Sequence, residues 1–505
     1  MLHVAFSFSL IRLLGSTQIP GDASDGLTLA PVVLEDGTPM DRLGGFGSAL
    51  TYTGIGSLYL ATPDRGPADG ATSWRDRAYL LDVRVDPGAA VPVSMTLVDV
   101  VPLVDEDGQG FVGSASAFDA SGSPSSSRLD PEGVRVSPHG TFYISDEYGP
   151  YLYEIDAWGQ RLRVLPVPDA FLVTHAGATV EAELPPGNAS GRQANRGMEG
   201  LAISPDGTKL YGIMQSALIQ DHGLDAANKR KGVYNRILEL DLATLVTREY
   251  VYPLEKAKNG VNEILAVDDH RFLVLERDGD GGTAAAFKRI YLVDLSGASD
   301  VSGVAALPQT GALPAGVTAA AKTLFIDLLD PAFGLAGARF PEKIEGLSWA
   351  PDLADGRHVL LVSVDNDLIA TTPSTLYAFA IDPAALPGLE PQVLSPAIDV
   401  QPGDRRHRVW PRFHLPAAVG ILSAGLLDAT AIDPGSVRLA GAPVRSFFGI
   451  PACLPWDLDR DGDTDLYCFV DGGALQLHPG DTRATLEAST TTGTPVRSQG
   501  AVSVR

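Results

Sequence analysis

A Glu-Gly-Leu/Val tripeptide recurs along the chain, each time at the start of a strand-like segment. It begins at Glu132, Glu199 and Glu345, with a variant at Glu263, so consecutive glutamates are 67, 64 and 82 positions apart. After an apolar run, each copy is followed by a second polar cluster: Asp146-Glu147, Gln215-Ser216, Glu276-Arg277-Asp278 and Asp365-Asn366-Asp367. Repeats of this length, with three or four short strands each, are typical of β-propeller blades.

The repeats end near residue 383, and the Glu-Gly-Leu unit does not recur after that point. We predict an all-β protein: a six- or seven-bladed β-propeller over 1–383, a linker at 384–397, and a small β-sandwich domain over 398–505. An N-terminal apolar stretch lacks a preceding basic residue and an A-x-A-like cleavage site, so no signal peptide is evident. We interpret Phe6–Leu10 as a first strand that runs into Leu13-Leu14-Gly15.

Charge narrows the possible partners. The formal net charge is −24, which argues against nucleic acid and against an anionic membrane surface, because both require clustered Lys and Arg. No segment has 18 uninterrupted apolar residues, so a transmembrane helix is not expected. We expect a monomer whose partner is a small molecule.

Propeller geometry predicts where the repeated polar positions meet. The innermost strand of a blade pairs antiparallel with the strand after it, so the start of the first strand lies beside the end of the second. The four glutamates should therefore converge at one mouth of the propeller with a second set of polar residues: Asp64, Arg65, Asp146, Glu147, Arg277, Asp365 and Asn366. Carboxylates so close together require cations, shared protons or arginine partners. A Glu-Gly pair can also simply mark a turn before a strand, with the glutamate binding backbone N–H groups.

A second motif lies near the C-terminus and has the pattern D-x-D-x-D-G-x-x-D. Its carboxylates are those of Asp457, Asp459, Asp461, Asp463 and Asp465. Carboxylates at alternating positions with a glycine for a sharp turn are typical of a calcium loop. Because Cys468 stands where an EF-hand has glutamate, we predict a structural Ca²⁺ loop between β-strands. An acidic turn without metal is the alternative.

The only two cysteines, Cys453 and Cys468, are fifteen positions apart. This spacing fits a disulfide that closes a hairpin-sized loop, and it also fits two buried thiols. A disulfide and calcium would both indicate an extracellular or periplasmic location.

Together these segments resemble the phytase-like esterase family, a propeller family named for the esterase-like activity of phytase. The segments that carry the resemblance are Arg42–Ser48, Pro63–Pro67, Leu129–Gly133, Ile144–Pro150, Asn195–Leu201, Leu275–Asp278 and Pro341–Leu347. The resemblance covers roughly residues 25–383 and implies a secreted or periplasmic propeller that hydrolyses esters or phosphoesters. The histidine-acid-phosphatase signature R-H-G-x-R-x-P is absent from the sequence, which excludes that phytase mechanism.

Our leading hypothesis is a metal-dependent hydrolase whose active site is the acidic mouth. The predicted catalytic residues are Glu132, Glu199, Glu263 and Glu345. The predicted substrate-binding residues are Arg65, Arg196 and Arg277. The predicted metal ligands are Asp64, Asp146, Glu147 and Asp365 at the mouth, with Ca²⁺ the first choice there, and the five aspartates of the C-terminal loop. The rival hypothesis is a non-catalytic secreted propeller that binds a ligand or acts as a scaffold, with structural calcium.

Overall fold

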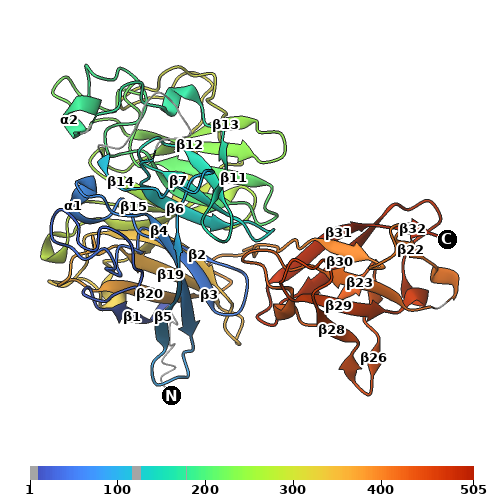
Figure 1. Cartoon of the computed structure of the whole chain (residues 1–505). Coiled ribbons are helices and arrows are strands. Elements are labelled where there is room, and N and C mark those ends of the chain that lie inside the picture. The colour runs from blue at the N-terminus through green and yellow to red at the C-terminus, as the bar shows by residue number, and fades with distance from the viewer. Residues whose placement is uncertain (1–9, 116–126, 178, 414) are drawn as a thin grey trace, which may run out of the picture.

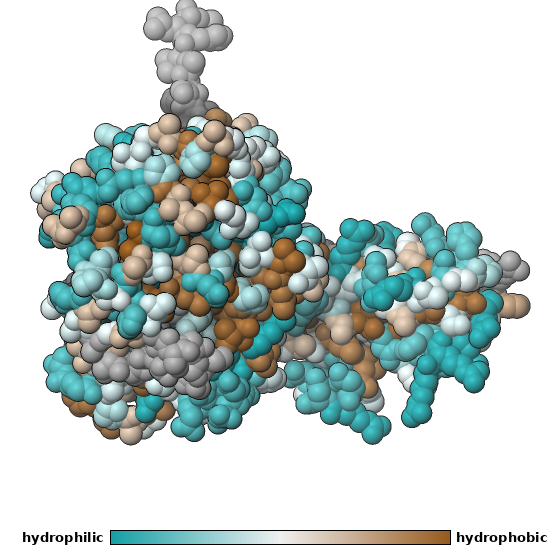
Figure 2. Space-filling view, turned by 90° about the horizontal axis from the view of Figure 1, so that it is seen from above, coloured by the Kyte–Doolittle hydropathy of each residue, from teal (hydrophilic) through white to brown (hydrophobic). Residues whose placement is uncertain are grey.

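The structure is a computed structural model, and it describes residues 10–115, 127–177, 179–413 and 415–505. The chain forms a larger lobe and a smaller one, both built almost entirely from β-strands (Figure 1). The smaller lobe projects from the side of the larger one when the molecule is viewed from above (Figure 2). None of the helices in the described ranges has the length and hydropathy needed to span a membrane.

The larger lobe contains five four-stranded antiparallel sheets. The first sheet consists of β2 (Ala49–Tyr52), β3 (Leu58–Thr62), β4 (Arg77–Val85) and β5 (Val93–Pro102). The second consists of β6 (Pro131–Val136), β7 (Phe142–Asp146), β8 (Leu152–Ile155) and β9 (Arg161–Leu165). The third consists of β10 (Met198–Ile203), β11 (Lys209–Met214), β12 (Tyr234–Asp241) and β13 (Thr247–Pro253). The fourth consists of β14 (Gly260–Ala266), β15 (Arg271–Arg277), β16 (Lys288–Asp294) and β17 (Ala321–Asp327). The fifth consists of β18 (Ile344–Ala350), β19 (His358–Val364), β20 (Ser374–Ile381) and the N-terminal strand β1 (Ile11–Ile19).

These sheets are the blades of a β-propeller. The inner strands β2, β6, β10, β14 and β18 pack side by side in sequence, and β18 packs against β2 to close the ring. The described residues therefore form five blades, fewer than the six or seven that we predicted. Two features account for the difference. Strand β1 completes the fifth blade by pairing with β20, and the long stretches between repeats hold loops and short helices: α1 (Pro67–Gly70), η2 (Asp169–Phe171), α2 (Val180–Glu183), η3 (Gly282–Ala284) and η4 (Pro331–Phe333).

The N-terminal strand contains the second part of the predicted one. Strand β1 begins at Ile11 and includes Leu13, Leu14 and Gly15, into which the predicted strand runs from Phe6–Leu10. Residues 6–9 of that prediction lie outside the described residues.

The smaller lobe is a β-sandwich. One sheet has the strand order β21 (Ile398–Val400), β23 (Ala417–Ile421), β29 (Asp465–Val470) and β28 (Cys453–Trp456). The other has the order β25 (Ala442–Pro443), β24 (Arg438–Leu439), β30 (Arg483–Ser489) and β31 (Pro495–Ala501). Shorter elements are β22 (Arg408–Val409) with β32 (Ser503–Val504), β26 (Ser446–Phe447) with β27 (Ile450–Pro451), and η5 (Pro411–Phe413), η6 (Ala429–Ala431) and η7 (Gly472–Ala474). Side chains from both sheets, including Val419 and Leu486, form one shared core.

The Glu-Gly repeat corresponds to a β-bulge at the start of an inner strand. The strand pairing shifts register between Pro131 and Gly133, and it shifts in the same way between Met198 and Gly200. In these two strands the glutamate is thus the extra residue of the bulge, which redirects its side chain. A glycine follows there because the next inner strand is close: a Cβ on Gly200 would lie 2.7 Å from the Cα of Glu263.

Candidate functional site at the acidic mouth of the propeller

Antiparallel pairing brings the repeated polar positions to one mouth of the propeller, with Glu263 as an exception described below. The start of each inner strand is paired with the end of the next strand: Pro131 with Asp146, Met198 with Met214, Gly260 with Arg277, and Ile344 with Val364. The polar side chains next to these pairs then divide into three groups around the mouth.

The first group is a chain of hydrogen bonds across three blades. Arg196 donates to the Gln215 amide oxygen, and Gln215 donates to Glu199. Asn262 Nδ2 then donates to Glu199 Oε1 at 2.8 Å and to Glu345 Oε1 at 3.3 Å. At the far end, Arg277 Nη2 pairs with Glu345 Oε1 at 2.6 Å. Two of the predicted glutamates therefore meet through an asparagine.

The second group is a compact cluster of carboxylates. Asp130, Glu132 and Glu147 each offer an oxygen, and these oxygens all lie within 4.8 Å of one another. Arg65 Nη1 pairs with Asp130 at 2.9 Å and with Glu147 at 3.4 Å. The Glu132 carboxylate has no hydrogen-bond or ion-pair partner among the residues that the structure describes, although the residue is only 6% exposed.

The third group surrounds one lysine. Lys343 Nζ lies 3.1 Å from Asp365 and 3.6 Å from Asp64, and it also pairs with Asp367. Oxygens of the three aspartates lie within 4.8 Å of one another. A half-buried cation already compensates this group, so it needs an added metal less than the second group does.

The electrostatics of the glutamates differ sharply. Burial raises the pKa of Glu132 well above its usual value, and Glu199 and Asp130 raise it further. Burial also raises the pKa of Glu199, with Glu147 and Glu345 adding to the effect. Burial acts in the same direction on Glu345, but Lys343 and Arg277 outweigh it and lower the pKa of that carboxyl. Glu132 and Glu199 are therefore the groups that can hold a proton or gain from a cation.

Two buried oxygens at the mouth support a cation there. Glu199 Oε2 and Asn262 Oδ1 have no hydrogen-bond partner among the described residues. The carboxylate of Glu199 also acts on Glu132, whose pKa it raises, and oxygen atoms of these kinds are the ligands that suit a hard ion such as Ca²⁺. The donor chemistry thus fits the predicted metal, and the fit comes from side chains that nothing else in the described chain satisfies.

Glu263 does not lie at the mouth, where we predicted it. In β14 the register shift lies between Val261 and Glu263, so Asn262 is the bulge residue that corresponds to Glu132 and Glu199. Glu263 occupies the position of the following glycine, and its side chain binds Arg135 at 2.9 Å inside the channel.

Arg135 and Glu263 close the channel below the mouth. Arg135 donates to the carbonyl oxygens of Leu50, Ile264 and Leu347, which belong to three other inner strands. The Glu263 side chain is fully buried, and burial raises its pKa to about 7 even though Arg135 opposes that effect. This pair holds blades together and does not face the mouth.

Asp146 is at the mouth, but its oxygens are already occupied. They accept hydrogen bonds from the backbone N–H groups of Asp130, Tyr148 and Gly149 at 2.9–3.1 Å. Burial raises its pKa to about 7. The residue shapes the turn after β7.

Sequence reasoning missed four residues of the mouth: Asp130, Arg230, Asn262 and Lys343. Arg230 is half-buried and belongs to a loop outside the repeat. Burial lowers its pKa to about 10, and Arg196 and Arg277 lower it further. The repeat could not reveal Arg230, because that residue lies outside it. Asp130 and Lys343 each stand two residues before a repeated glutamate, so that spacing could have revealed them.

The C-terminal aspartate loop connects β28 and β29, as predicted. Oxygens of Asp457, Asp459 and Asp465 lie within 4.8 Å of one another, and this cluster does not include Asp461 or Asp463. The Asp465 carboxylate also accepts hydrogen bonds from the backbone N–H groups of Ser423 and Leu458, at 2.8 and 2.7 Å.

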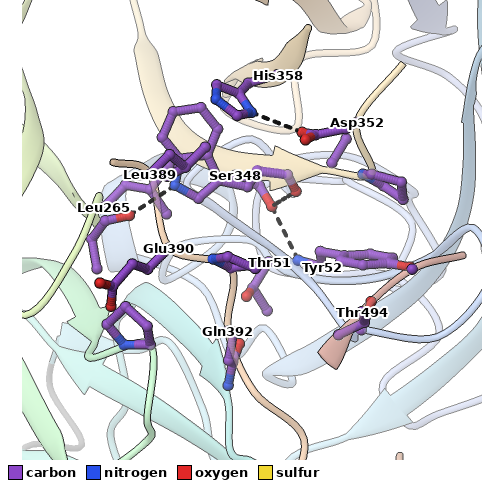
Figure 3. A pocket seen from close by; sticks show the side chains of 18 of the residues that line it. Thr51, Tyr52, Leu265, Ser348, Asp352, His358, Leu389, Glu390, Gln392 and Thr494 are labelled. Carbon is purple, nitrogen blue, oxygen red and sulfur yellow. Dashed lines mark hydrogen bonds and ion pairs between the residues drawn. The ribbon is translucent and has the colours of Figure 1, made fainter. Parts of the chain in front are cut away.

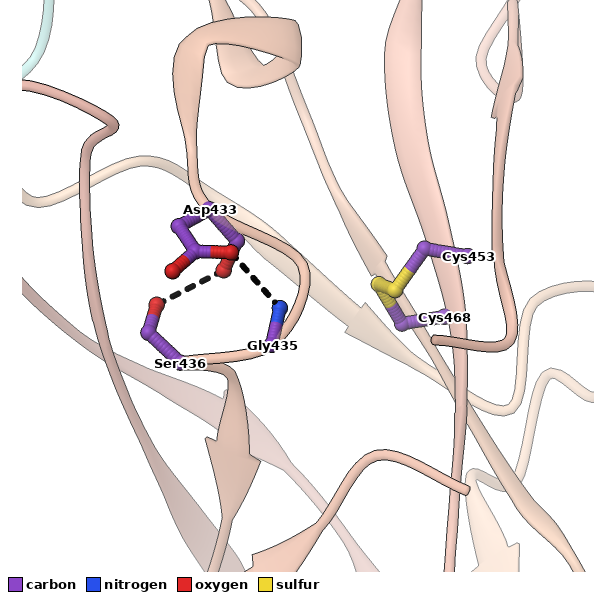
Figure 4. The surroundings of a disulfide bond; sticks show 5 residues. All are labelled: Asp433, Gly435, Ser436, Cys453 and Cys468. Atoms are coloured by element: carbon purple, nitrogen blue, oxygen red, sulfur yellow. Dashed lines mark hydrogen bonds between the residues drawn. A yellow bond between two sulfur atoms is a disulfide. The ribbon is translucent and has the colours of Figure 1, made fainter. Parts of the chain in front are cut away.

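The two cysteines form a disulfide, so the first of the two predicted alternatives is confirmed. Cys453 of β28 and Cys468 of β29 are direct cross-strand partners, and they lie near the turn of Asp433, Gly435 and Ser436 (Figure 4). The bond ties together the two strands that flank the aspartate loop.

The opposite mouth of the channel holds a cavity of about 260 Å³. Its walls come from the ends of inner strands, from the linker around Glu390 and from the β30–β31 turn at Thr494 (Figure 3). His358 Nδ1 lies 3.0 Å from Asp352 Oδ1 at the rim. The repeat directs no glutamate to this side.

Comparisons with known proteins agree with the architecture. A family model described as "Phytase-like: Esterase-like activity of phytase" matches residues 41–368. An "Uncharacterized secreted protein" of Arthroderma benhamiae is 31% identical over 320 residues, which cover 49% of this chain and 61% of the relative. The chain thus spans less than two thirds of that relative's length.

Among solved structures, the β-propeller domain of Cps50 (Swd1) from Myceliophteria thermophila is 13% identical. The match covers 66% of this chain and 82% of that chain, with a TM-score of 0.27. The calcium-binding protein regucalcin from Agrobacterium tumefaciens is 11% identical, covering 65% and 95% of the two chains, with a TM-score of 0.26. Likeness at this level does not extend to a site or a ligand.

Proposed function

We infer the function of this chain from its family: the chain belongs to the phytase-like family, since the family model covers residues 41–368. Membership suggests a secreted β-propeller with hydrolase-like activity. We propose that the chain hydrolyses ester or phosphoester bonds of a small molecule, outside the cytosol, with the acidic mouth as its active site. The disulfide and the secreted relative support that location.

One observation carries the proposal. Glu132 is a nearly buried carboxylate without a partner among the described residues, and it lies beside Asp130 and Glu147. A folded chain gains nothing from such a group, because an uncompensated buried carboxylate is unfavourable. Groups of this kind, with a pKa shifted by burial and by like charges, are concentrated at functional sites.

The residues of the mouth divide into two roles. Glu132, Glu199 and Asn262 Oδ1 would hold a divalent cation, and such a cation, when bound, supplies Lewis acidity and an activated water. Because its pKa is raised, Glu132 can also hold a proton and release it during a reaction. Arg196 and Arg277 stand at the two ends of the hydrogen-bonded chain, and Arg65 stands beside Glu147; these guanidinium groups would bind the anionic oxygens of the substrate.

The aspartate loop would hold a second, structural Ca²⁺. Asp457, Asp459 and Asp465 supply the clustered carboxylates. A bound ion would offset their mutual repulsion and fix the loop between two disulfide-linked strands.

The test compares turnover of p-nitrophenyl acetate and p-nitrophenyl phosphate with Ca²⁺ and with a chelator. We expect activity that the chelator abolishes and that Glu132→Gln reduces at least about a hundredfold. Glu154→Gln is the matched control, since Glu154 of β8 pairs with Arg163 of β9 at the end of the blade away from the mouth. Equal activity of Glu132→Gln and wild type would exclude the mouth as the active site.

A non-catalytic, calcium-stabilised propeller is the second candidate. The lysine that compensates Asp64 and Asp365 favours it, because much of the acidic mouth is already structurally satisfied. No turnover with either substrate and any divalent metal, together with a Glu132-dependent thermal stabilisation by Ca²⁺, would support this candidate instead.

A further inference from the structure

The sandwich lobe carries an exposed apolar finger, which we define as residues 446–456. It consists of the β26–β27 hairpin and the edge strand β28, and the hairpin projects from the lobe (Figure 1). Five large apolar side chains in this segment are more than half exposed: Phe447 (61%), Phe448 (106%), Ile450 (70%), Leu454 (56%) and Trp456 (66%). Clustered exposure of this kind marks an interaction site.

The hairpin tip is built at a conformational disadvantage. Phe447 pairs with Ile450, so the two central residues are Phe448 and Gly449, with φ values of 53° and 84°. A two-residue turn with both φ values positive is favoured by Asn-Gly, and a bulky residue at the first position is unfavourable. Since Phe448 is also fully exposed, the isolated fold gains neither backbone stability nor burial from this side chain.

Charge is arranged at the base of the finger and not along it. Residues 446–456 contain no Asp, Glu, Lys or Arg. Arg445 precedes the hairpin, and its guanidinium forms no hydrogen bond or ion pair with any described residue. Asp457 opens the acidic loop on the other side. The finger therefore has an apolar tip, with the cation of Arg445 and the carboxylates of the acidic loop at its base. This arrangement complements a surface that is apolar inside and carries both positive and negative groups in its outer layer.

From this arrangement we propose that the finger inserts into a zwitterionic lipid surface, the chemistry of a phosphatidylcholine bilayer. Phe447, Phe448 and Ile450 would enter the acyl region, and Trp456 would lie at the interface, where its ring is favoured. Arg445 would contact lipid phosphates, and the acidic loop would face choline groups. A fluid bilayer accommodates a narrow projecting hairpin, whereas a protein partner must present a matching cleft. The net charge of −24 disfavours an anionic bilayer.

The experiment measures co-flotation of the full chain with vesicles of phosphatidylcholine alone and of phosphatidylcholine mixed with phosphatidylserine. We expect wild type to bind phosphatidylcholine vesicles and Phe448→Asn to bind at least about tenfold more weakly, since one exposed phenyl group is lost. Because Asn-Gly suits the turn, the same variant should unfold at an equal or higher temperature, which separates binding from folding. Val32→Ser is the matched control, as Val32 is 70% exposed on the propeller lobe.

Three results would overturn the proposal. The first is absence of wild-type binding to both vesicle types. The second is equal binding by Phe448→Asn and wild type. The third is preferential binding to phosphatidylserine vesicles that Phe448→Asn does not change, since that would reflect surface charge. If wild type instead self-associates in sedimentation-velocity runs without binding vesicles, and Phe448→Asn does not, the occupant of the finger is a second copy of the chain.

Discussion

Removal of the arginine that closes the propeller channel tests the architecture most directly. Arg135 and Glu263 are almost completely buried, and their side chains lie 2.9 Å apart. Replacing Arg135 by Met leaves Glu263 without its counter-ion and leaves the carbonyl oxygens of Leu50 and Ile264 without a donor. Unsatisfied buried acceptors of this type cost about 1–3 kcal/mol each, so we expect a loss of roughly 3 kcal/mol in the free energy of unfolding even at pH 6.

The pH dependence of that loss carries the sharper information. Burial raises the pKa of Glu263 to about 7 in the wild type. A carboxyl with a raised pKa keeps its proton in the folded state after the unfolded chain has released it, so stability falls as pH rises and stops falling above the folded pKa. In Arg135→Met the folded pKa is higher, and the fall continues. The variant therefore loses further stability relative to wild type as the pH rises above 7, by about 1 kcal/mol for each pH unit up to the folded pKa of Glu263 in the variant.

Urea unfolding followed by circular dichroism at pH 6 and pH 9 measures both parts. The double variant Arg135→Met/Glu263→Gln should keep the loss at pH 6 and show no additional loss at pH 9. If Arg135→Met were destabilised equally at both pH values, the carboxylate of Glu263 would not depend on Arg135, and the buried pair would be refuted.

Three further predictions concern the mouth and the sandwich. Glu132→Gln should raise the melting temperature of the chelated protein more at pH 8 than at pH 5, because a carboxyl whose folded pKa is raised becomes destabilising as pH rises above its unfolded value; an equal shift at both pH values in thermal melts would contradict this. Asp459→Ala should abolish a Ca²⁺-induced rise in melting temperature, whereas Asp463→Ala, outside the carboxylate cluster, should retain it; loss in both variants would show that the ion uses the whole loop. Cys453→Ser/Cys468→Ser should lower the free energy of unfolding by about 3 kcal/mol, the value for a loop of 15 residues. A reducing agent should lower the free energy of unfolding of the wild type and leave that of the variant unchanged.

The position of the mouth was predictable because the repeat has a steric cause. A glycine after the bulges of β6 and β10 allows the neighbouring inner strand to approach: a Cβ on Gly133 would lie 2.6 Å from Leu201. The Glu-Gly pair in the sequence therefore indicates a close contact between two neighbouring blades. The family resemblance rests on these same segments, and the match over residues 41–368 confirms it.

The blade count depends on contacts that leave no such record. Strand β1 joins the fifth blade by pairing Ile11 with Ile381, and nothing in the alternating pattern of a single strand specifies a partner so distant in the chain. Without that pairing, an unassigned strand at the N-terminus and long stretches between repeats both suggest further blades. Sequence spacing overestimates the count whenever loops are long and a terminal strand completes the last sheet.

The incorrect prediction for Glu263 shows a different limit of sequence comparison. We aligned Glu263 with the other glutamates because it is the same residue type, although it occupies a different backbone position in the bulge. Asn262 takes the bulge position, where its amide can donate to Glu199 and Glu345 at once, which a third carboxylate could not do. Glu263 can then occupy a glycine position because its side chain turns into the channel toward Arg135. The departure from the motif in one blade thus relieves repulsion between the glutamates of the two neighbouring blades and supplies the anion for the channel arginine. This irregular repeat thus allows Glu199 and Glu345 to approach each other across the mouth.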